Sequence, residues 1–381
     1  MKLQVKMGLK LLPARRGPHV RLCVSILLGL VACAGMVSFA REARAGERLA
    51  YAVVSKASDF TAAKTEIFCI DPDTSEKELL FSDANTSIIL LQRLYVFHFP
   101  VAGGGRLFAH AAHRSAFVPF PGNDSLWELS VDGSNDFRRM THVLGGESLG
   151  DLFVNSTGTR IGYINVMDRK QYILIHDVAS GKLLNQVDIT DMFLDCYASS
   201  IGWLPESERL YVSLEIGDVH ITSEASYARV GTYLMDEHGE HVVKLSELPP
   251  RKGYFPPETV RMIGMLPGGE YVFETMQGRV HPSGEQSRSL FAVVKAARDF
   301  SMIEDMSFSP ATGLYSGIRV SYRLSPSGTY LSAAGLPISS SAVSCDLWLK
   351  NLQTGLERNI LSLPTQGLQG PFLGLVGWID H

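Results

Sequence analysis

The chain has 381 residues and a formal net charge of −4, and its 35 glycines and 18 prolines are scattered along it at turn positions. A simple length prior allows two domains, but repeat folds exceed that prior as one unit. Residues 46–381 hold 27 basic and 38 acidic residues, a net charge of −11, and so acidic a chain has no electrostatic reason to bind nucleic acid or anionic lipid.

The first 45 residues have the layout of a secretory signal peptide. Six basic residues precede an uncharged, largely apolar stretch at 22–39, and Ala43-Arg44-Ala45 offers a small-x-small cleavage site. Two alternatives stay open: a retained membrane anchor, since about 18 apolar residues nearly span a bilayer, and a bacterial lipobox at 30–33 that would lipidate Cys33. We expect residues 1–45 to be a signal peptide and 46–381 to be one domain in the periplasm or elsewhere outside the cytoplasm.

Three cysteines remain beyond this leader, at Cys69, Cys196 and Cys345. Their wide spacing excludes compact zinc signatures and CxxC redox pairs. Cys69 and Cys345 lie in apolar runs and are predicted to be buried thiols. An odd number of cysteines in an exported protein leaves at least one unpaired.

The stretch at 154–190 shows the pattern that recurs along the chain. Short runs rich in Ile, Val, Leu and Tyr alternate with polar turns that contain Gly158 and Gly181. Such runs are too short for helices, which need apolar positions spaced by three and four over ten or more residues. The pattern is typical of consecutive antiparallel strands joined by tight turns.

Six units of this kind follow one another. Predicted strands lie at 49–54, 66–70, 77–81, 93–99, 107–111, 125–131, 137–141, 161–166, 172–178, 183–190, 201–204, 209–215, 231–235, 241–245, 260–266, 271–275, 289–294, 319–324, 329–333, 346–352 and 357–361. The second turn of each unit recurs every 48 to 60 residues, near 73, 133, 181, 239, 298 and 355. This period indicates an all-β fold, a β-propeller of six four-stranded blades, with seven blades as the alternative.

Ring closure provides a separate expectation. The first unit lacks an inner strand before Leu49, while an apolar run at 372–379 is left over at the end of the chain. If this C-terminal run is the innermost strand of the N-terminal blade, no open sheet edge remains at the seam. We also expect Gly133 and Gly355 to occupy equivalent turns with φ > 0, and Trp127 and Trp348 to occupy equivalent third strands.

Two segments resemble the repeats of TolB-type propellers. Residues 122–141 end a strand in an Asp-Gly turn before an Arg-Leu-Thr-like strand, and the segment from Arg323 to Leu331 is similar to the Ser-Pro-Asp-Gly turn of those repeats. The resemblance covers roughly 47–379, and its degenerate motifs are shared with WD-repeat-like and other propellers. It implies the fold and says little about function. We expect this chain to lack the N-terminal α/β domain that accompanies the propeller in TolB, because the repeats leave no room for it.

The long connections are predicted to lie on one face of the ring, at 83–92, 112–124, 191–199, 216–230, 249–259, 276–288, 305–318 and 334–344. Long loops on one face of a rigid ring usually carry binding. Their candidate ligand contacts are His110, His113, Arg114, Asp218, His220, Arg251, Tyr254 and His281.

These candidates fall short of a catalytic or metal site. His110 and His113 lack a third metal ligand, and Asp218 with His220 is at most an acid–base pair. The chain has no His-Glu-x-x-His or phosphate-loop motif. No catalytic residue, metal or cofactor is predicted.

The leading hypothesis is therefore a non-catalytic exported propeller that binds a protein or a small ligand. The alternative is a lactonase-like or other hydrolase with its site at the axial mouth. The hydrolase would be favoured if three or more of the following side chains lay close together in the folded protein: His98, His110, His113, Glu215, Asp218 and His281.

Overall fold

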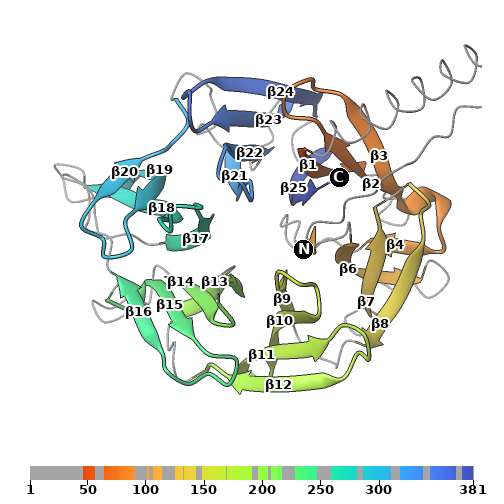
Figure 1. Cartoon of the computed structure of the whole chain (residues 1–381), viewed down its shortest axis with the longest axis horizontal. Coiled ribbons are helices and arrows are strands. Elements are labelled where there is room, and N and C mark those ends of the chain that lie inside the picture. Colours follow the sequence, from red (N-terminus) through yellow and green to blue (C-terminus); the bar gives the residue numbers. More distant parts are fainter. Residues whose placement is uncertain are drawn as a thin grey trace, which may run out of the picture. The chain divides into compact units, whose positions relative to one another are not determined.

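Antiparallel strands make up almost all of the structure, a computed structural model of the chain. It describes residues 46–55, 64–90, 101–102, 106–113, 125–131, 133–142, 148–168, 170–190, 196–204, 207–216, 228–246, 259–280, 286–309, 318–337, 344–365 and 371–380. Within the unit Glu47–His381, six antiparallel blades form a ring (Figure 1). The chain is a six-bladed β-propeller, so the predicted fold is confirmed and the seven-bladed alternative is wrong.

The blades follow the order of the chain, and their strands are named here from the axis outward. Blade 1 consists of β25 (Phe372–Asp380), β1 (Glu47–Ser55), β2 (Lys64–Ile70) and β3 (Lys77–Ser82). A short 3-10 helix, η2 (Asp83–Asn85), leads to blade 2. Blade 2 consists of β4 (Ile88–Leu90) and β5 (Val101–Ala102), which both pair with β6 (Arg106–His113), then β7 (Ser125–Ser130) and β8 (Phe137–His142).

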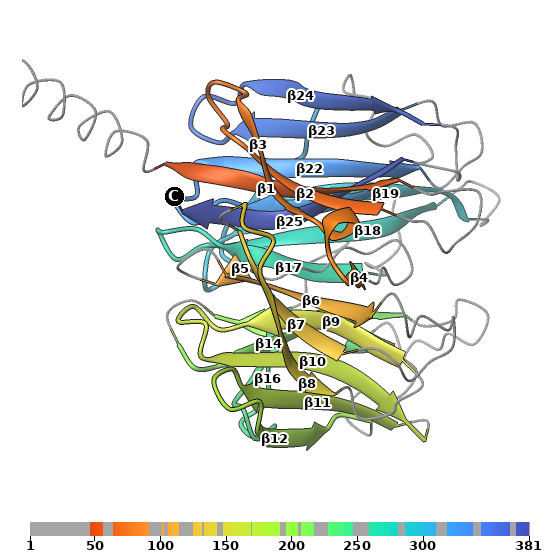
Figure 2. The same cartoon turned by 90° about the vertical axis from the view of Figure 1, so that its right-hand side faces the viewer.

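The remaining four blades have the same order of strands. Blade 3 consists of β9 (Ser148–Val154), β10 (Arg160–Met167), β11 (Lys170–Asp177) and β12 (Leu183–Asp188), and blade 4 of β13 (Cys196–Trp203), β14 (Leu210–Ile216), β15 (Gly231–Met235) and β16 (Val243–Ser246). Blade 5 consists of β17 (Thr259–Met265), β18 (Tyr271–Val280), β19 (Gln286–Ala296) and β20 (Ile303–Asp305), and blade 6 of β21 (Ile318–Leu324), β22 (Tyr330–Pro337), β23 (Ser344–Asn351) and β24 (Glu357–Pro364). In side view the strands run between the two faces of the ring (Figure 2).

Each blade is a slab between two apolar layers, as β23 illustrates. Successive side chains of a strand point to opposite faces of the sheet. Cys345, Leu347 and Leu349 are buried in a cluster with blade 1, whereas Trp348 packs against the cluster shared with blade 5. A blade therefore cannot bury both faces alone, which is why neighbours must stack until the ring closes.

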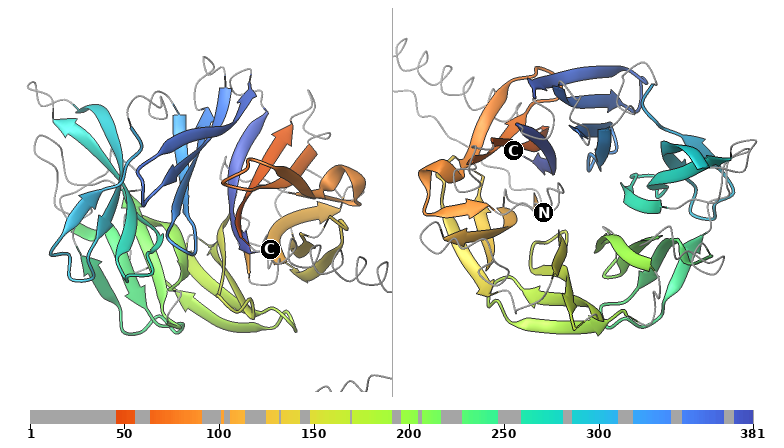
Figure 3. Two further views of the ribbon diagram at one scale, coloured as in Figure 1. Left: turned by 45° about the horizontal axis from the view of Figure 1, so that its top comes forward. Right: turned by 180° about the vertical axis from the view of Figure 1, so that it is seen from behind.

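The ring closes through the C-terminal strand, as the sequence predicted. β25 pairs antiparallel with β1 from Glu47↔Asp380 to Val54↔Phe372, with one irregularity beside Ala50. Figure 3 shows the two strands side by side at the inner edge of blade 1. Closing the ring with both ends of the chain leaves no exposed edge at the seam.

Glycines shape the short turns. Gly133, Gly181, Gly239 and Gly355, in the turns between third and fourth strands, have φ between 68° and 80°. Only glycine adopts this region without steric cost, so the expectation for Gly133 and Gly355 is confirmed. Trp127 and Trp348 do lie on the third strands β7 and β23.

These outer turns also join neighbouring blades. A Cβ atom on Gly181 would lie 2.6 Å from the carbonyl oxygen of Met140 in the outermost strand of blade 2. The turn of blade 2 behaves in the same way, because Asn135 accepts a 2.8 Å hydrogen bond from the backbone of Ser82 in blade 1. The outer turn of one blade therefore rests on the last strand of the blade before it.

Several strand boundaries differ from the prediction. The first strand of blade 3, β9, was missed, because its run at 148–154 mixes glycine and aspartate with apolar residues. The predicted strand at 93–99 lies outside the described residues; β4 and β5, on either side of it, hold the innermost position of blade 2. The predicted loop at 276–288 is mostly strand, since β18 and β19 extend to Val280 and Gln286.

The described cysteines match their predicted environment. Cys69 and Cys345 are free and fully buried, and burial raises the pKa of the Cys345 thiol to about 11. The leader at 1–45 lies outside the described residues, so its function stays a prediction. Among the residues described, no helix is long and apolar enough to cross a membrane.

Candidate functional site

The topology separates two faces of the ring. In blades 2 to 6 a short turn joins the first strand to the second, and in all six blades a short turn joins the third strand to the fourth. These turns lie on one face, here called the short-turn face. In blade 1 the first strand is the C-terminal β25, which pairs with β1 without a connecting turn. The connections that join second to third strands, and one blade to the next, begin and end on the opposite long-connection face. The longest of these is the 14-residue connection at 217–230, followed by two of 12 residues at 247–258 and 306–317; the connections at 217–230 and 247–258 both leave blade 4.

The predicted ligand contacts lie almost entirely in the long connections. His110 and His113 are residues of β6, and His113 is the last residue of that strand, not part of a loop as predicted. Their side chains lie outside the described part of the structure. So do the other six candidates, Arg114, Asp218, His220, Arg251, Tyr254 and His281. Their role as ligand contacts therefore stays a prediction.

An ionic cluster lies where blades 4 and 5 meet at the long-connection face. Arg261, on the innermost strand β17, is 3.8 Å from a Glu215 carboxylate oxygen and 3.7 Å from one of Glu274. The three side chains are 18%, 12% and 10% exposed. Carboxylates this buried are stable when a cation accompanies them, and Arg261 serves both. Six residues were named above whose proximity would favour a hydrolase. Glu215 is the one among them whose side chain is described, and it forms an ion pair with Arg261.

Backbone pairing holds this cluster in place. Glu215, next to the end of β14, pairs with Thr259 at the start of β17, and this contact merges blades 4 and 5 into one sheet. Beneath it, the Ser213 hydroxyl lies 2.9 Å from that of Thr232 and accepts a 3.0 Å hydrogen bond from the backbone of Met262. The end of β14, where the connection at 217–230 begins, and the start of β17, where the connection at 247–258 ends, are thereby fixed relative to each other.

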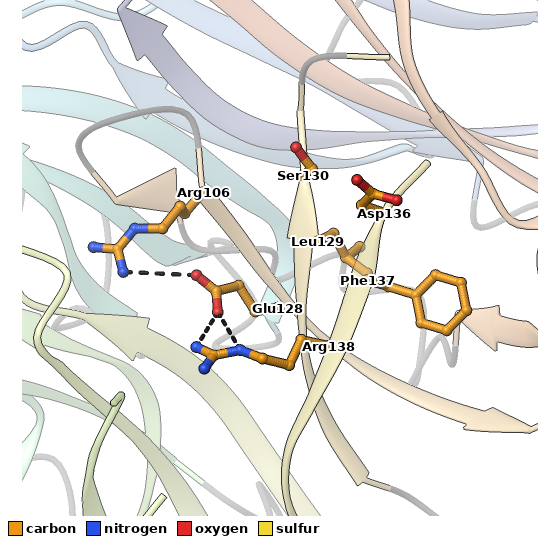
Figure 4. A pocket seen from close by; sticks show the side chains of 7 residues that line it. All are labelled: Arg106, Glu128, Leu129, Ser130, Asp136, Phe137 and Arg138. Atoms are coloured by element: carbon orange, nitrogen blue, oxygen red, sulfur yellow. Dashed lines mark hydrogen bonds and ion pairs between the residues drawn. The ribbon is translucent and has the colours of Figure 1, made fainter. Parts of the chain in front are cut away.

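A pocket of about 260 Å³ lies on blade 2 at the short-turn face. Its lining residues are Arg106, Glu128, Leu129, Ser130, Asp136, Phe137 and Arg138, shown in Figure 4. The Glu128 carboxylate, 15% exposed, accepts 3.1 Å and 2.5 Å hydrogen bonds from Nε and Nη2 of Arg138, and Arg106 is 3.6 Å away. The cluster presents two guanidinium groups around one carboxylate.

One described group of side chains has the composition of a metal site. Asp236, Glu240 and His241, in the outer turn of blade 4, offer ligand atoms within 4.8 Å of one another. Asp236 already accepts hydrogen bonds from two backbone N–H groups of the turn, at His238 and Glu240, and lies 2.8 Å from His241 Nδ1. The hydrogen bond with His241 is the main cause that lowers the pKa of Asp236, and the backbone hydrogen bonds lower this pKa further. These hydrogen bonds explain why the three side chains lie close together: they stabilise the turn between β15 and β16.

A buried histidine serves the core of blade 3. His176 is 3% exposed, and burial lowers its pKa. Its Nδ1 lies 3.2 Å from the Gly181 carbonyl oxygen and its Nε2 lies 3.3 Å from the Tyr163 hydroxyl. A neutral ring protonated at Nδ1 donates to the carbonyl and accepts from the tyrosine, which satisfies both nitrogens. This histidine is structural.

Comparison with known proteins supports the fold. No known family matches the sequence, and no curated protein is significantly similar to it. TolB from Acinetobacter baumannii superposes with a TM-score of 0.52 at 12% identity, over 87% of this chain and 66% of that one. The chain has the TolB-type propeller fold. The resemblance read from the sequence is thus confirmed for the fold alone, and the chain spans slightly less than two thirds of TolB.

Two further solved structures have TM-scores below 0.5. A chain of a nidogen/laminin complex has a TM-score of 0.47 at 9% identity, over 88% of this chain and 98% of that one. A putative 6-phosphogluconolactonase from Bacteroides fragilis has a TM-score of 0.44 at 12% identity, over 87% and 97%.

The charged clusters of the described residues were not predicted. Arg261 stands inside an otherwise apolar predicted inner strand, at 260–266, and that position was a signal that it needs a buried partner. Glu128 and Arg138 lie on adjacent predicted strands, but their contact depends on the pairing Glu128↔Arg138, which the sequence alone does not fix.

Proposed function

We propose that this protein is exported from the cytoplasm and acts as a non-catalytic binding propeller, with a protein or a small ligand bound on the long-connection face. The observation that carries the proposal is the topology. The ring places the connections from second to third strands, and from one blade to the next, on one face. The cluster of Glu215, Arg261 and Glu274 lies where two long connections of blade 4, at 217–230 and 247–258, begin and end. Binding residues usually lie on loops that a rigid scaffold positions.

Export rests on the leader at 1–45, which has the basic, apolar and small-residue regions of a signal peptide. The intact mass of the protein from the envelope fraction of its host tests this part. A chain that begins at Gly46 is expected. A mass that corresponds to a lipidated Cys33 would replace cleavage by lipid anchoring, and a full-length chain in the cytoplasm would contradict export.

Binding is tested by capture from envelope extract with paired variants. In one variant, residues 217–227 are replaced by glycine and serine at equal length, which keeps the buried Val230. In the control, the exposed Gln353 and Leu356 of the short-turn face are replaced by serine. The proposal expects one reproducible partner that the first variant loses and the control retains. Equal capture by all three proteins would contradict a binding site on the long-connection face.

A further inference from the structure

We propose that the pocket of blade 2 binds a small zwitterionic ligand, a free amino acid or a short peptide. Its carboxylate would lie at Arg138 and Arg106 and its ammonium group at Asp136. This site lies on the short-turn face, so it is independent of the binding proposed for the opposite face. It would give the ring two distinct ligand surfaces.

The positive end of the pocket is organised in advance. Arg138 directs Nε and Nη2 to one oxygen of Glu128, which leaves its other terminal nitrogen with donor capacity, and its side chain is 58% exposed. Arg106 is anchored in the next blade, because its Nη2 donates a 3.1 Å hydrogen bond to the Gly158 carbonyl. Glu128 neutralises one of the two guanidinium charges, and planar guanidinium groups suit carboxylate ligands.

The negative end is separate. Figure 4 shows the Asp136 carboxylate beside Ser130 and apart from the arginine–glutamate cluster. Asp136 is exposed, and within the described residues no cationic side chain contacts its carboxylate. Its backbone is fixed, since Asp136 accepts a 2.9 Å hydrogen bond from the Ser130 N–H. The carboxylate is thereby available to a ligand.

Charge and size together select the ligand class. The formal charges of Arg106, Arg138, Glu128 and Asp136 cancel, so a simple anion meets two carboxylates and a simple cation meets two guanidinium groups. A ligand with both charges avoids either repulsion. The volume of about 260 Å³ lies below the roughly 300–1,000 Å³ of pockets for drug-sized molecules, which favours a molecule the size of an amino acid or dipeptide.

The test is an NMR titration of the purified protein with glycylglycine, observed at the arginine Nε–H signals. Exposed charge contacts are weak, so we expect a dissociation constant on the order of 1 mM. N-acetylglycylglycine, which lacks the ammonium group, and glycylglycine amide, which lacks the carboxylate, should each bind about two- to fivefold more weakly.

Three variants separate this site from general charge effects. Arg138→Gln should weaken glycylglycine binding about two- to fivefold, and Asp136→Asn should weaken it while leaving the acetylated peptide unaffected. Lys77→Gln, at the start of the outermost strand of blade 1, is the matched control and should change nothing. The proposal is overturned if glycylglycine at about 10 mM leaves the Arg138 signal unmoved, if the capped peptides bind equally well, or if neither pocket variant alters binding.

Discussion

Shortening Leu373 should destabilise the entire ring. This residue of β25 is fully buried between blades 1 and 6, in a cluster with Leu49 and Leu347. A buried Leu→Ala change costs about 2–5 kcal/mol, because apolar contact is lost and a cavity remains. A whole domain is stable by only about 5–15 kcal/mol, so one truncated side chain in the closing strand should remove a large fraction of the stability.

The assay is thermal unfolding of Leu373→Ala beside Leu356→Ala. Leu356 is 66% exposed, just before β24, so its truncation should change the free energy of unfolding by no more than about 0.5 kcal/mol. For a ring of this size, a loss of 2–5 kcal/mol corresponds to a fall of roughly 3–7 °C in Tm. Removal of residues 371–381 should leave no cooperative transition near the original Tm, because it takes away six buried apolar side chains: Phe372, Leu373, Leu375, Val376, Trp378 and Ile379. Equal melting of the two alanine variants, or an unchanged Tm after truncation, would refute closure through β25.

Three further predictions concern other parts of the ring. Gly181→Ala should lower stability more than Gly355→Ala in chemical denaturation, because both have positive φ but only at Gly181 would the Cβ meet a neighbouring carbonyl; equal losses would contradict the seam between blades 2 and 3. His176 has a pKa lowered by burial, so its contribution is complete above the ordinary value of 6.5 and is lost as the pH falls below that value. The stability difference between pH 8 and pH 5.5 should therefore shrink in His176→Gln, and a difference as large as in the wild type would show that His176 is not the group responsible. Arg261→Gln should cost about 3–5 kcal/mol, since it leaves two buried carboxylates without that cation, whereas Arg138→Gln, at an exposed pair, should cost at most about 1 kcal/mol; similar losses for both would argue against the ionic cluster as a structural element.

The fold could be read from the sequence because its signals are local and repeated. Glycines at equivalent turns and short apolar runs mark each blade, and the apolar run at the C-terminus has one position in the ring that buries it. β9 could not be predicted because Gly150 and Asp151 interrupt its apolar pattern. These two residues lie at a register shift, and the residues on either side of them pair with β10.

The charged clusters depend on contacts between distant parts of the chain. Arg261 meets Glu215 because β17 adjoins β14 across a blade boundary, 46 positions along the chain. Arg106 reaches the turn of the next blade, at Gly158. Strand periodicity predicts which side chains share a face, but it does not give the stagger between blades that brings such residues together.

Site-specific photo-crosslinking in intact cells tests the central claim, that partners bind the long-connection face. A photoreactive residue is placed in turn at Ala225 and Lys252, in the two long connections of blade 4, and at the exposed Thr74 and Gln353, on the short-turn face. We predict that the first two positions give an adduct of one discrete mass and that the last two give none. Adducts from no position would contradict a protein partner, and adducts from Thr74 or Gln353 alone would contradict binding on the long-connection face.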